Sequence, residues 1–141
     1  MRIQSMKAGL YYVGDLCYVM SDRWDEFCDI TIDGHTCLNG QFNMKDGTRF
    51  ASHSTLYGDG CYKDQDGKEY CVDAGLIGCI LFDDITDPKA TMEHIKEREL
   101  GHLIQFDEGF TTSSDEEGVI QFGHIIINTG YYEDEDEDEW G

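Results

Sequence analysis

The sequence predicts a mainly β, single-domain protein, built as a β-meander, small barrel or sandwich with one or two short surface helices; an α+β fold is the second choice. Five Asp-Gly or Asn-Gly pairs fall within thirty-five residues, and short β-prone runs flank several of them. The chain has 141 residues, of which 40% are hydrophobic, enough for one core. We therefore expect one globular domain over residues 1–132, followed by an acidic tail at 133–141.

The expected strands follow β-branched and aromatic runs between these turn pairs. Such pairs tolerate the positive φ angles that two-residue hairpin turns require. The turn pairs are Asp33-Gly34, Asn39-Gly40, Asp46-Gly47, Asp59-Gly60 and Asp66-Gly67. The strands are expected at residues 9–20, 30–32, 41–44, 48–51, 70–72, 76–82, 103–106 and 119–128.

A first short helix is expected after residue 20. Ser21 or Asp22 can cap a turn in which Trp24, Phe27 and Cys28 share one face. The shared apolar face predicts a helix that packs against the sheet.

A second helix is expected from Pro88 toward Gly101. Asp87 is a preferred N-cap residue, and proline is favoured at the first helical position. The apolar stripe is thin, mainly Met92, Ile95 and Leu100, so this helix should lie on the surface.

The six cysteines have two interpretations. They contain no CxxC pair and no histidine at zinc-finger spacing, and several lie in apolar runs where a reduced cysteine acts as a small hydrophobic residue. The alternative is a disulfide framework, because their number is even and their intervals have hairpin length. The first interpretation favours a reducing cytoplasm without bound metal or cofactor. The cysteines are Cys17, Cys28, Cys37, Cys61, Cys71 and Cys79.

The N-terminal segment predicts neither export nor membrane insertion. It carries Arg2 and Lys7, but Gly14-Asp15 interrupts the apolar stretch that begins at Leu10. No apolar run approaches the length of a transmembrane helix. We expect a soluble protein that stays in the cytoplasm.

Charge is the most informative feature for function. The formal net charge is −20, and residues 99–141 hold thirteen acids without any Lys or Arg. Such a chain is not expected to bind nucleic acid or anionic lipid directly, whereas a basic protein surface suits it. The alternative is that the acids only keep the protein soluble.

The expected partner-binding residues form an acidic loop and the acidic tail. The loop is a predicted hairpin tip, with a solvated polar turn as its alternative. An extended chain places one residue every ~3.3 Å, close to the phosphate spacing of a nucleic-acid strand, so seven consecutive acids can imitate its charge. In the alternative, Lys89, Lys96 and Arg98 neutralise part of the tail. The binding candidates are Asp115, Glu116, Glu117, Glu133, Asp134, Glu135, Asp136, Glu137, Asp138, Glu139 and the aromatic anchor Trp140.

An enzyme is not expected, because the chain lacks nucleophile-elbow, zinc-protease, P-loop and dinucleotide-binding motifs. The enzymatic alternative is a carboxylate-metal hydrolase in which Asp15, Asp59 and Asp73 converge, with His53 nearby in sequence.

Other polar residues favour structural roles. The stretch at 64–69 reads better as a hairpin turn than as a calcium loop, because it lacks the EF-hand glycine position and final Glu. His35 and His124 are expected in strands, and His94 and His102 around the second helix, without the spacing of a metal-ligand set.

Three blocks of the sequence resemble a known group of proteins. They are the opening YYVGDLCYV at 11–19, the YGDG turn at 57–60 and the VDAGLIG strand at 72–78. These blocks resemble small uncharacterised proteins encoded by bacteriophages and bacteria, although Leu16 stands where the similar proteins tend to have proline. The resemblance covers roughly residues 9–82 and leaves the acidic C-terminal part outside. It implies no activity and no catalytic residue.

A phage setting favours one function over its alternatives. Small, very acidic phage proteins often resemble inhibitors that imitate DNA, so we expect binding to a basic host nuclease, restriction or defence complex, or transcription factor. The first alternative is a β-domain interaction module with the tail as a solubility device; the second is the metal hydrolase above. The module would use Tyr11, Tyr12, Tyr18, Tyr57 and Tyr62.

Overall fold

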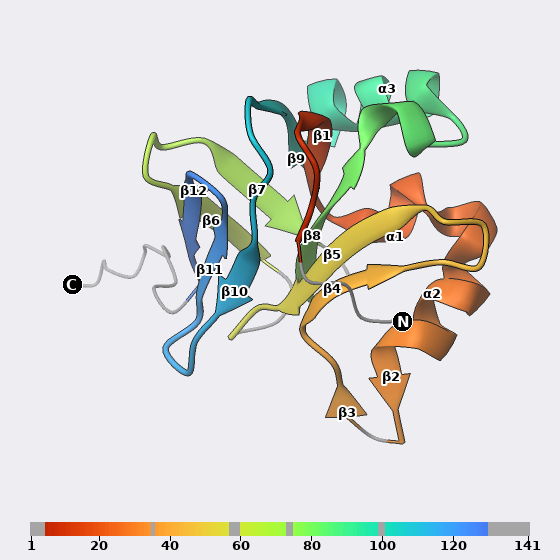
Figure 1. Cartoon of the computed structure of the whole chain (residues 1–141). Helices are drawn as coiled ribbons and strands as arrows, with labels where there is room; N and C mark the ends of the chain where they lie inside the picture. The colour runs from red at the N-terminus through yellow and green to blue at the C-terminus, as the bar shows by residue number, and fades with distance from the viewer. Residues whose placement is uncertain (1–4, 35, 57–59, 73–74, 99–100, 130–141) are drawn as a thin grey trace.

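Two five-stranded antiparallel sheets make up the protein in the computed structural model, which describes residues 5–34, 36–56, 60–72, 75–98 and 101–129 (Figure 1). The mainly β prediction is confirmed. The first sheet contains, in spatial order, β4 (Gly40–Asn43), β5 (Arg49–Ser54), β8 (Leu76–Leu81), β1 (Gly9–Gly14) and β9 (Gly101–Phe106). The second contains β10 (Thr112–Ser114), β11 (Val119–Phe122), β12 (Ile125–Asn128), β6 (Gly60–Asp64) and β7 (Glu69–Val72).

The remaining elements are short. A two-stranded hairpin joins β2 (Ile32–Asp33) to β3 (Thr36–Cys37). The helices are α1 (Leu16–Val19), α2 (Trp24–Thr31) and α3 (Pro88–Arg98), with 3-10 turns η1 (Ser21–Arg23) and η2 (Phe82–Asp84). No helix among the described residues is both long and apolar enough to cross a membrane.

The first sheet is buried on both faces. Successive residues of β1 point to opposite sides, so Tyr11 and Val13 enter the core between the two sheets while Tyr12 enters a second core. This second core holds side chains from α1 and α2, including Leu16 and Phe27. Double burial explains why β8 is a continuous apolar run rather than an alternating one.

The two sheets meet along both pairs of edges, which gives the sandwich a barrel-like closure. Strand β7 lies against β9, and β10 lies against β4 and β5. In the described residues, side chains rather than a backbone ladder join these edges. His102 Nε2 lies 2.7 Å from the Glu69 carbonyl oxygen, and the Thr112 N–H donates to Gln41 Oε1. Such contacts protect edge strands from pairing with other chains. We call them the β7–β9 seam and the β4–β10 seam.

Several local predictions are confirmed. Pro88 begins α3, and the Ala90 N–H donates to Asp87 Oδ1 at 3.1 Å, as an N-cap requires. The segment 64–69 is a hairpin turn between β6 and β7. Asp64 Oδ1 accepts from the Asp66 and Lys68 N–H groups at 2.8 and 3.0 Å, which closes the turn.

One expected strand ends earlier than predicted, and another is divided in two. The strand at 9–20 stops at Gly14, because the Asp15 carboxylate accepts a hydrogen bond from the Cys17 N–H and caps α1. The β-branched run at 119–128 is two strands, because Gly123 adopts a φ of 57° in a turn that also holds His124. The strand placement of His124 was therefore wrong, and His35 lies outside the described residues.

The predicted strand at 30–32 was wrong at its first two residues, since only Ile32 lies in a strand, β2. Ile30 and Thr31 belong to α2, where the Thr31 hydroxyl donates to the Phe27 carbonyl at 2.9 Å. Trp24 and Phe27 stack on the expected shared face, with ring centroids 4.4 Å apart. The N-cap of α2 is Arg23, the last residue of η1, rather than Ser21 or Asp22, and its side chain makes no capping hydrogen bond.

The apolar stripe of α3 differs from the prediction. Met92 is 46% exposed, whereas Thr91, which is 1% exposed, takes the inward position. The Thr91 hydroxyl is satisfied by the Asp87 carbonyl, so a polar residue can occupy this position. Ile95 packs against the second core as expected, and Leu100 lies outside the described residues.

The cysteines divide between the two interpretations. Cys61 and Cys71 face each other across the β6–β7 hairpin and form a disulfide, so the reduced interpretation was wrong for this pair. Cys79 is a buried free cysteine in β8, as expected of a small hydrophobic residue, and Cys17 and Cys28 are partly buried.

Candidate functional site

The acidic loop at residues 115–117 is the tip of the β10–β11 hairpin, as predicted. Asp115 Oδ1 accepts hydrogen bonds from the Glu117 and Val119 N–H groups, both at 3.0 Å. The Asp115 carboxylate therefore stabilises the turn through hydrogen bonds to its backbone. Glu116 and Glu117 are exposed and form no ion pair with another described residue. Asp115 is exposed as well, so all three carboxylates of the loop are accessible to a partner.

The acidic loop lies beside the point where the C-terminal segment leaves the second sheet. The Thr129 N–H donates to the Gly118 carbonyl at 2.8 Å, and the Thr129 hydroxyl donates to the same oxygen. Thr129 is fully buried, so this junction is firmly held. In the sequence, the run of seven acids begins at Glu133, four residues after Thr129.

The predicted tail residues Glu133, Asp134, Glu135, Asp136, Glu137, Asp138, Glu139 and Trp140 lie outside the described residues. Their binding role stays a prediction, as does neutralisation by the bases of α3. Thr129, the last described residue before this segment, is bonded to Gly118 directly after the acidic loop, although the two are separated in sequence.

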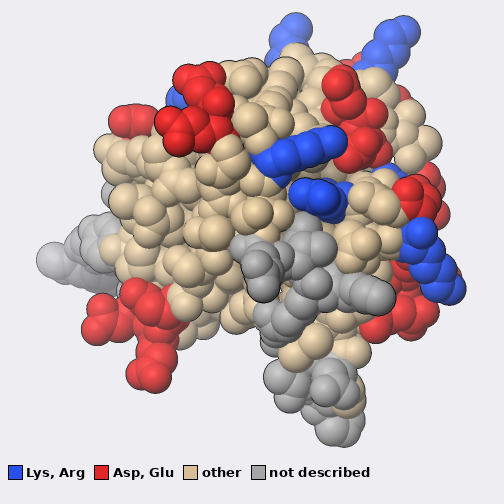
Figure 2. Space-filling view, in the orientation of Figure 1, with Lys and Arg blue, Asp and Glu red and all other residues tan. Residues whose placement is uncertain are grey.

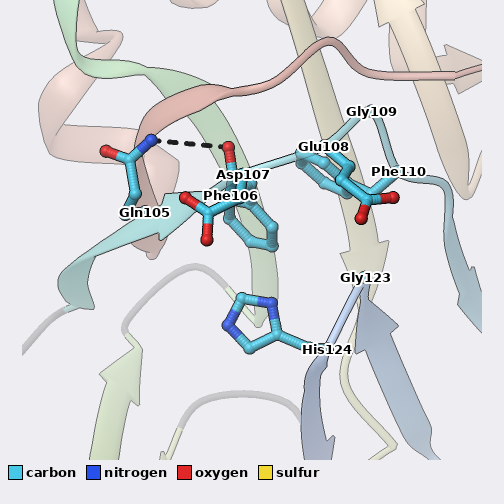
Figure 3. A pocket seen from close by; sticks show the side chains of 8 residues that line it. All are labelled: Gln105, Phe106, Asp107, Glu108, Gly109, Phe110, Gly123 and His124. Carbon is cyan, nitrogen blue, oxygen red and sulfur yellow. Dashed lines mark hydrogen bonds between the residues drawn. The ribbon is translucent and has the colours of Figure 1, made fainter.

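A second acidic loop lies at the opposite end of β11. Asp107 and Glu108 follow β9 and line a hollow of about 450 Å³ with Phe110 and His124 (Figure 3). Phe106 stacks on Phe110, with ring centroids 4.0 Å apart. Sequence reasoning did not single out this pocket, because its residues come from two separate turns. The strand register places it away from residues 115–117, since Thr112 pairs with Phe122 and Ser114 with Ile120.

Charge on the viewed face of the molecule is divided into separate groups. Figure 2 shows several clusters of acidic side chains with Lys and Arg between some of them. One acidic cluster, at the lower left, lies where Figure 1 shows the tip of the β10–β11 hairpin. The acidic loop therefore projects from the body of the protein and is sterically accessible to a partner.

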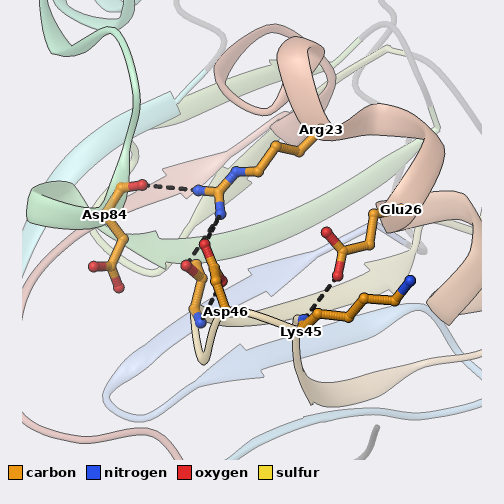
Figure 4. A network of polar contacts seen from close by, with 6 residues as sticks. Arg23, Glu26, Lys45, Asp46 and Asp84 are labelled. Carbon is orange, nitrogen blue, oxygen red and sulfur yellow. Dashed lines mark hydrogen bonds and ion pairs between the residues drawn. The ribbon is translucent and has the colours of Figure 1, made fainter.

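The Arg23 side chain, just before α2, links the helical region to the β4–β5 turn. Its guanidinium donates to Asp46 Oδ2 at 3.1 Å, to the Thr48 hydroxyl at 3.0 Å and to the Asp84 carbonyl at 2.9 Å (Figure 4). Hydrogen bonds from Thr48, and secondarily the Arg23 charge, lower the pKa of Asp46. Glu26 Oε2 accepts from the Lys45 N–H at 2.7 Å on the same side. These contacts fasten the β4–β5 turn to the helices.

The aspartates of the hydrolase alternative do not form a described site. Asp15 is fully buried and caps α1, while Asp59 and Asp73 lie outside the described residues. Within the described ranges, no group of three or more His, Cys, Asp or Glu side chains could hold a metal ion.

The tyrosines of the module alternative are mostly in the cores. Tyr11 and Tyr12 are fully buried, and Tyr62 is 1% exposed, so these three side chains cannot contact a partner. Burial raises the pKa of Tyr11 and of Tyr12. The Tyr18 side chain and Tyr57 lie outside the described residues.

The β4–β10 seam contains a polar cluster that no local sequence motif predicts. His53, on β5, is 2% exposed; its Nδ1 lies 2.9 Å from Ser114 Oγ and its Nε2 lies 2.8 Å from Thr112 Oγ1. Both hydroxyls come from β10, where residues two apart share one face. A hollow of about 360 Å³ opens beside the cluster and is also lined by Asn39 and Gln41.

Together these features define an acid-rich β-sandwich with an exposed acidic hairpin and a polar seam. No family model, curated protein or solved structure matches the chain. The functional argument therefore depends on the residues of this protein alone.

Proposed function

We propose that the protein binds a basic, nucleic-acid-handling protein through its acidic loop and acidic tail, and that it inhibits this partner as a DNA mimic. The observation that carries the proposal is the junction at Thr129. It holds Thr129, which precedes a sequence with seven consecutive acids at 133–139, against Gly118, the residue directly after Glu116 and Glu117. Two acidic elements separated in sequence can therefore present their charge to one surface.

The charge distribution supports a basic partner. Residues 99–141 contain no Lys or Arg, so this part of the chain offers no base to neutralise the loop or the tail. Electrostatic complementarity of this kind mainly accelerates association and selects partners by charge. In the phage setting that the resemblance implies, the partner is a host nuclease, defence complex or transcription factor.

An apolar contact can accompany the charges. Leu56 is 48% exposed, and its N–H donates to the Thr129 hydroxyl at 3.0 Å. An apolar side chain therefore lies close to the junction. Interfaces commonly combine buried apolar contacts with a charged rim, so Leu56 extends the proposed binding surface.

The test is a host-lysate pull-down with the full chain, followed by mass spectrometry. We expect a basic DNA- or RNA-handling protein that is released when salt rises from about 0.1 M to about 1 M, where the Debye length falls to ~3 Å. Double-stranded DNA should displace the same protein. Retention of the partner at high salt and in excess DNA would contradict the mimic proposal.

Matched charge variants localise the interaction. Glu116→Gln with Glu117→Gln should weaken binding of the captured partner by about 2- to 30-fold, because each exposed charge contributes roughly 0.2–1 kcal/mol. A chain ending at Tyr132 should weaken it further. Glu93→Gln with Glu97→Gln on α3 removes the same charge elsewhere and should leave binding unchanged. Equal effects of the loop and helix variants would exclude a specific acidic surface.

A further inference from the structure

We propose that Ser114, with His53 as its general base, is a nucleophile for acyl transfer from small neutral esters. This activity is separate from the binding function proposed above. It departs from the expectation that the chain is not an enzyme. That expectation rested on local motifs, whereas His53 and Ser114 are 61 residues apart and meet only because β10 packs against β5.

The geometry satisfies the first requirement of an activated serine. Ser114 Oγ and His53 Nδ1 are 2.9 Å apart, within the range for direct proton transfer. The required tautomer carries its proton on Nε2 and donates it to the Thr112 hydroxyl at 2.8 Å. Thr112 is a positioning residue, because its N–H is in turn bonded to Gln41 Oε1. The imidazole is thus held on both sides.

Ser114 is a better nucleophile candidate than Thr112. The Ser114 hydroxyl is primary and therefore less hindered than the secondary hydroxyl of threonine. Ser114 also ends β10 immediately before the acidic loop, and it is partly exposed beside the hollow. Thr112 begins β10, and its backbone N–H is bonded to Gln41.

The hollow indicates the class of substrate. Its lining side chains are amides, hydroxyls and one imidazole, with Asn39, Gln41 and Ser113 among them. These groups suit a small, polar and uncharged acyl group. The carboxylates of the adjacent acidic loop disfavour an anionic ester, because like charges repel.

The proposed reaction has two steps. Ser114 Oγ bonds to the ester carbonyl carbon while its proton passes to His53 Nδ1; the bond to the leaving alcohol then breaks, and that alcohol takes the proton from Nδ1. Water next adds to the acyl-serine and gives a proton to Nδ1. The bond to Ser114 Oγ breaks, the proton returns to Ser114, and the carboxylic acid is released.

The test is labelling of the intact full chain with an alkyl fluorophosphonate, followed by mass spectrometry and peptide mapping. We expect one phosphonyl adduct, located on Ser114, in the folded protein and none in protein unfolded by urea. Ser114→Ala should abolish the adduct. It should also reduce hydrolysis of p-nitrophenyl acetate at least 10-fold. Thr111→Ala, which removes an exposed hydroxyl nearby, should change neither result.

The labelling of the unmodified protein decides the matter even if a variant folds poorly. No adduct after prolonged exposure, or an adduct on another residue, would overturn the proposal. Equal ester hydrolysis by folded Ser114→Ala, with its fold checked by circular dichroism, would overturn it as well. A single adduct on Ser114 together with loss of hydrolysis in this variant would support it.

Discussion

Gly78, in the centre of β8, is a position where a single methyl group should destabilise the whole fold. A Cβ at this position would overlap the carbonyl oxygen of Ala51 on the neighbouring strand and lie 2.5 Å from Leu16 Cδ1. Neither neighbour can move easily, because one belongs to the backbone of β5 and the other to the second core. The main cost of Gly78→Ala is therefore steric.

Overpacking of a well-packed core costs about 1–3 kcal/mol, and a clash with backbone belongs at the upper end. We expect Gly78→Ala to lower the free energy of unfolding by about 3 kcal/mol. For a domain of this size, that change should lower Tm by roughly 6–12 °C. Urea unfolding followed by circular dichroism measures the change directly, with an unaltered m-value as the sign that stability alone has changed.

Gly109→Ala is the matched control. A Cβ at Gly109 would lie 3.3 Å from the Met6 carbonyl oxygen, so a small adjustment can relieve the contact. We expect a change within about 0.5 kcal/mol, as for ordinary surface substitutions. A loss below about 1 kcal/mol for Gly78→Ala, or equal losses for both variants, would refute the packing argument.

Three further predictions concern the β6–β7 hairpin, the buried tyrosines and α3. Reduction of the Cys61–Cys71 disulfide, or Cys61→Ser with Cys71→Ser, should lower the unfolding free energy by about 2–3 kcal/mol. The disulfide links residues ten positions apart, and breaking it gives the unfolded chain more conformational freedom. Equal urea midpoints with and without reductant would contradict this. Burial, and then the hydrogen bond to Asp64, raise the pKa of Tyr70 above its usual 10.0, so the protonated form is favoured in the folded state. Stability should be complete below pH 10 and fall as pH rises beyond it, and Tyr70→Phe should lessen that fall in unfolding curves between about pH 9 and 11. Asp87→Ala should cost about 1 kcal/mol by removing the cap of α3, whereas Asp83→Ala, at an exposed neighbouring carboxylate, should not.

The sequence predicted those elements whose cause is local. The Asp87-Pro88 pair defined the start of α3, and the Asp66-Gly67 pair defined the β6–β7 turn. The prediction of one strand over residues 9–20 was wrong, because the apolar run continues through α1. Only the capping role of Asp15 marks the change from strand to helix. In the same way, the apolar run at 119–128 concealed the turn at Gly123.

The candidate sites depend on contacts that no local pattern encodes. The acidic hairpin was predictable because turn residues and charges are adjacent in sequence. Its proximity to Thr129 was not, because that contact arises from the pairing of β11 with β12. The contact between His53 and Ser114 depends on the meeting of two sheets, so neither residue has a neighbour in sequence that indicates it.

The position of β1 has a consequence for how the chain acquires its structure during synthesis. This strand is made early, yet its partners β8 and β9 follow some seventy and ninety residues later, with Gly14 opposite Gly78 and Gly101. Tyr11, Tyr12 and Val13 must therefore remain without their native neighbours until most of the chain has left the ribosome. Non-local pairing of this kind slows folding and exposes apolar surface in the interval. A ribosome-bound chain that stops before β9 should consequently bind chaperones and resist compaction, whereas one that extends past Asn128 should fold.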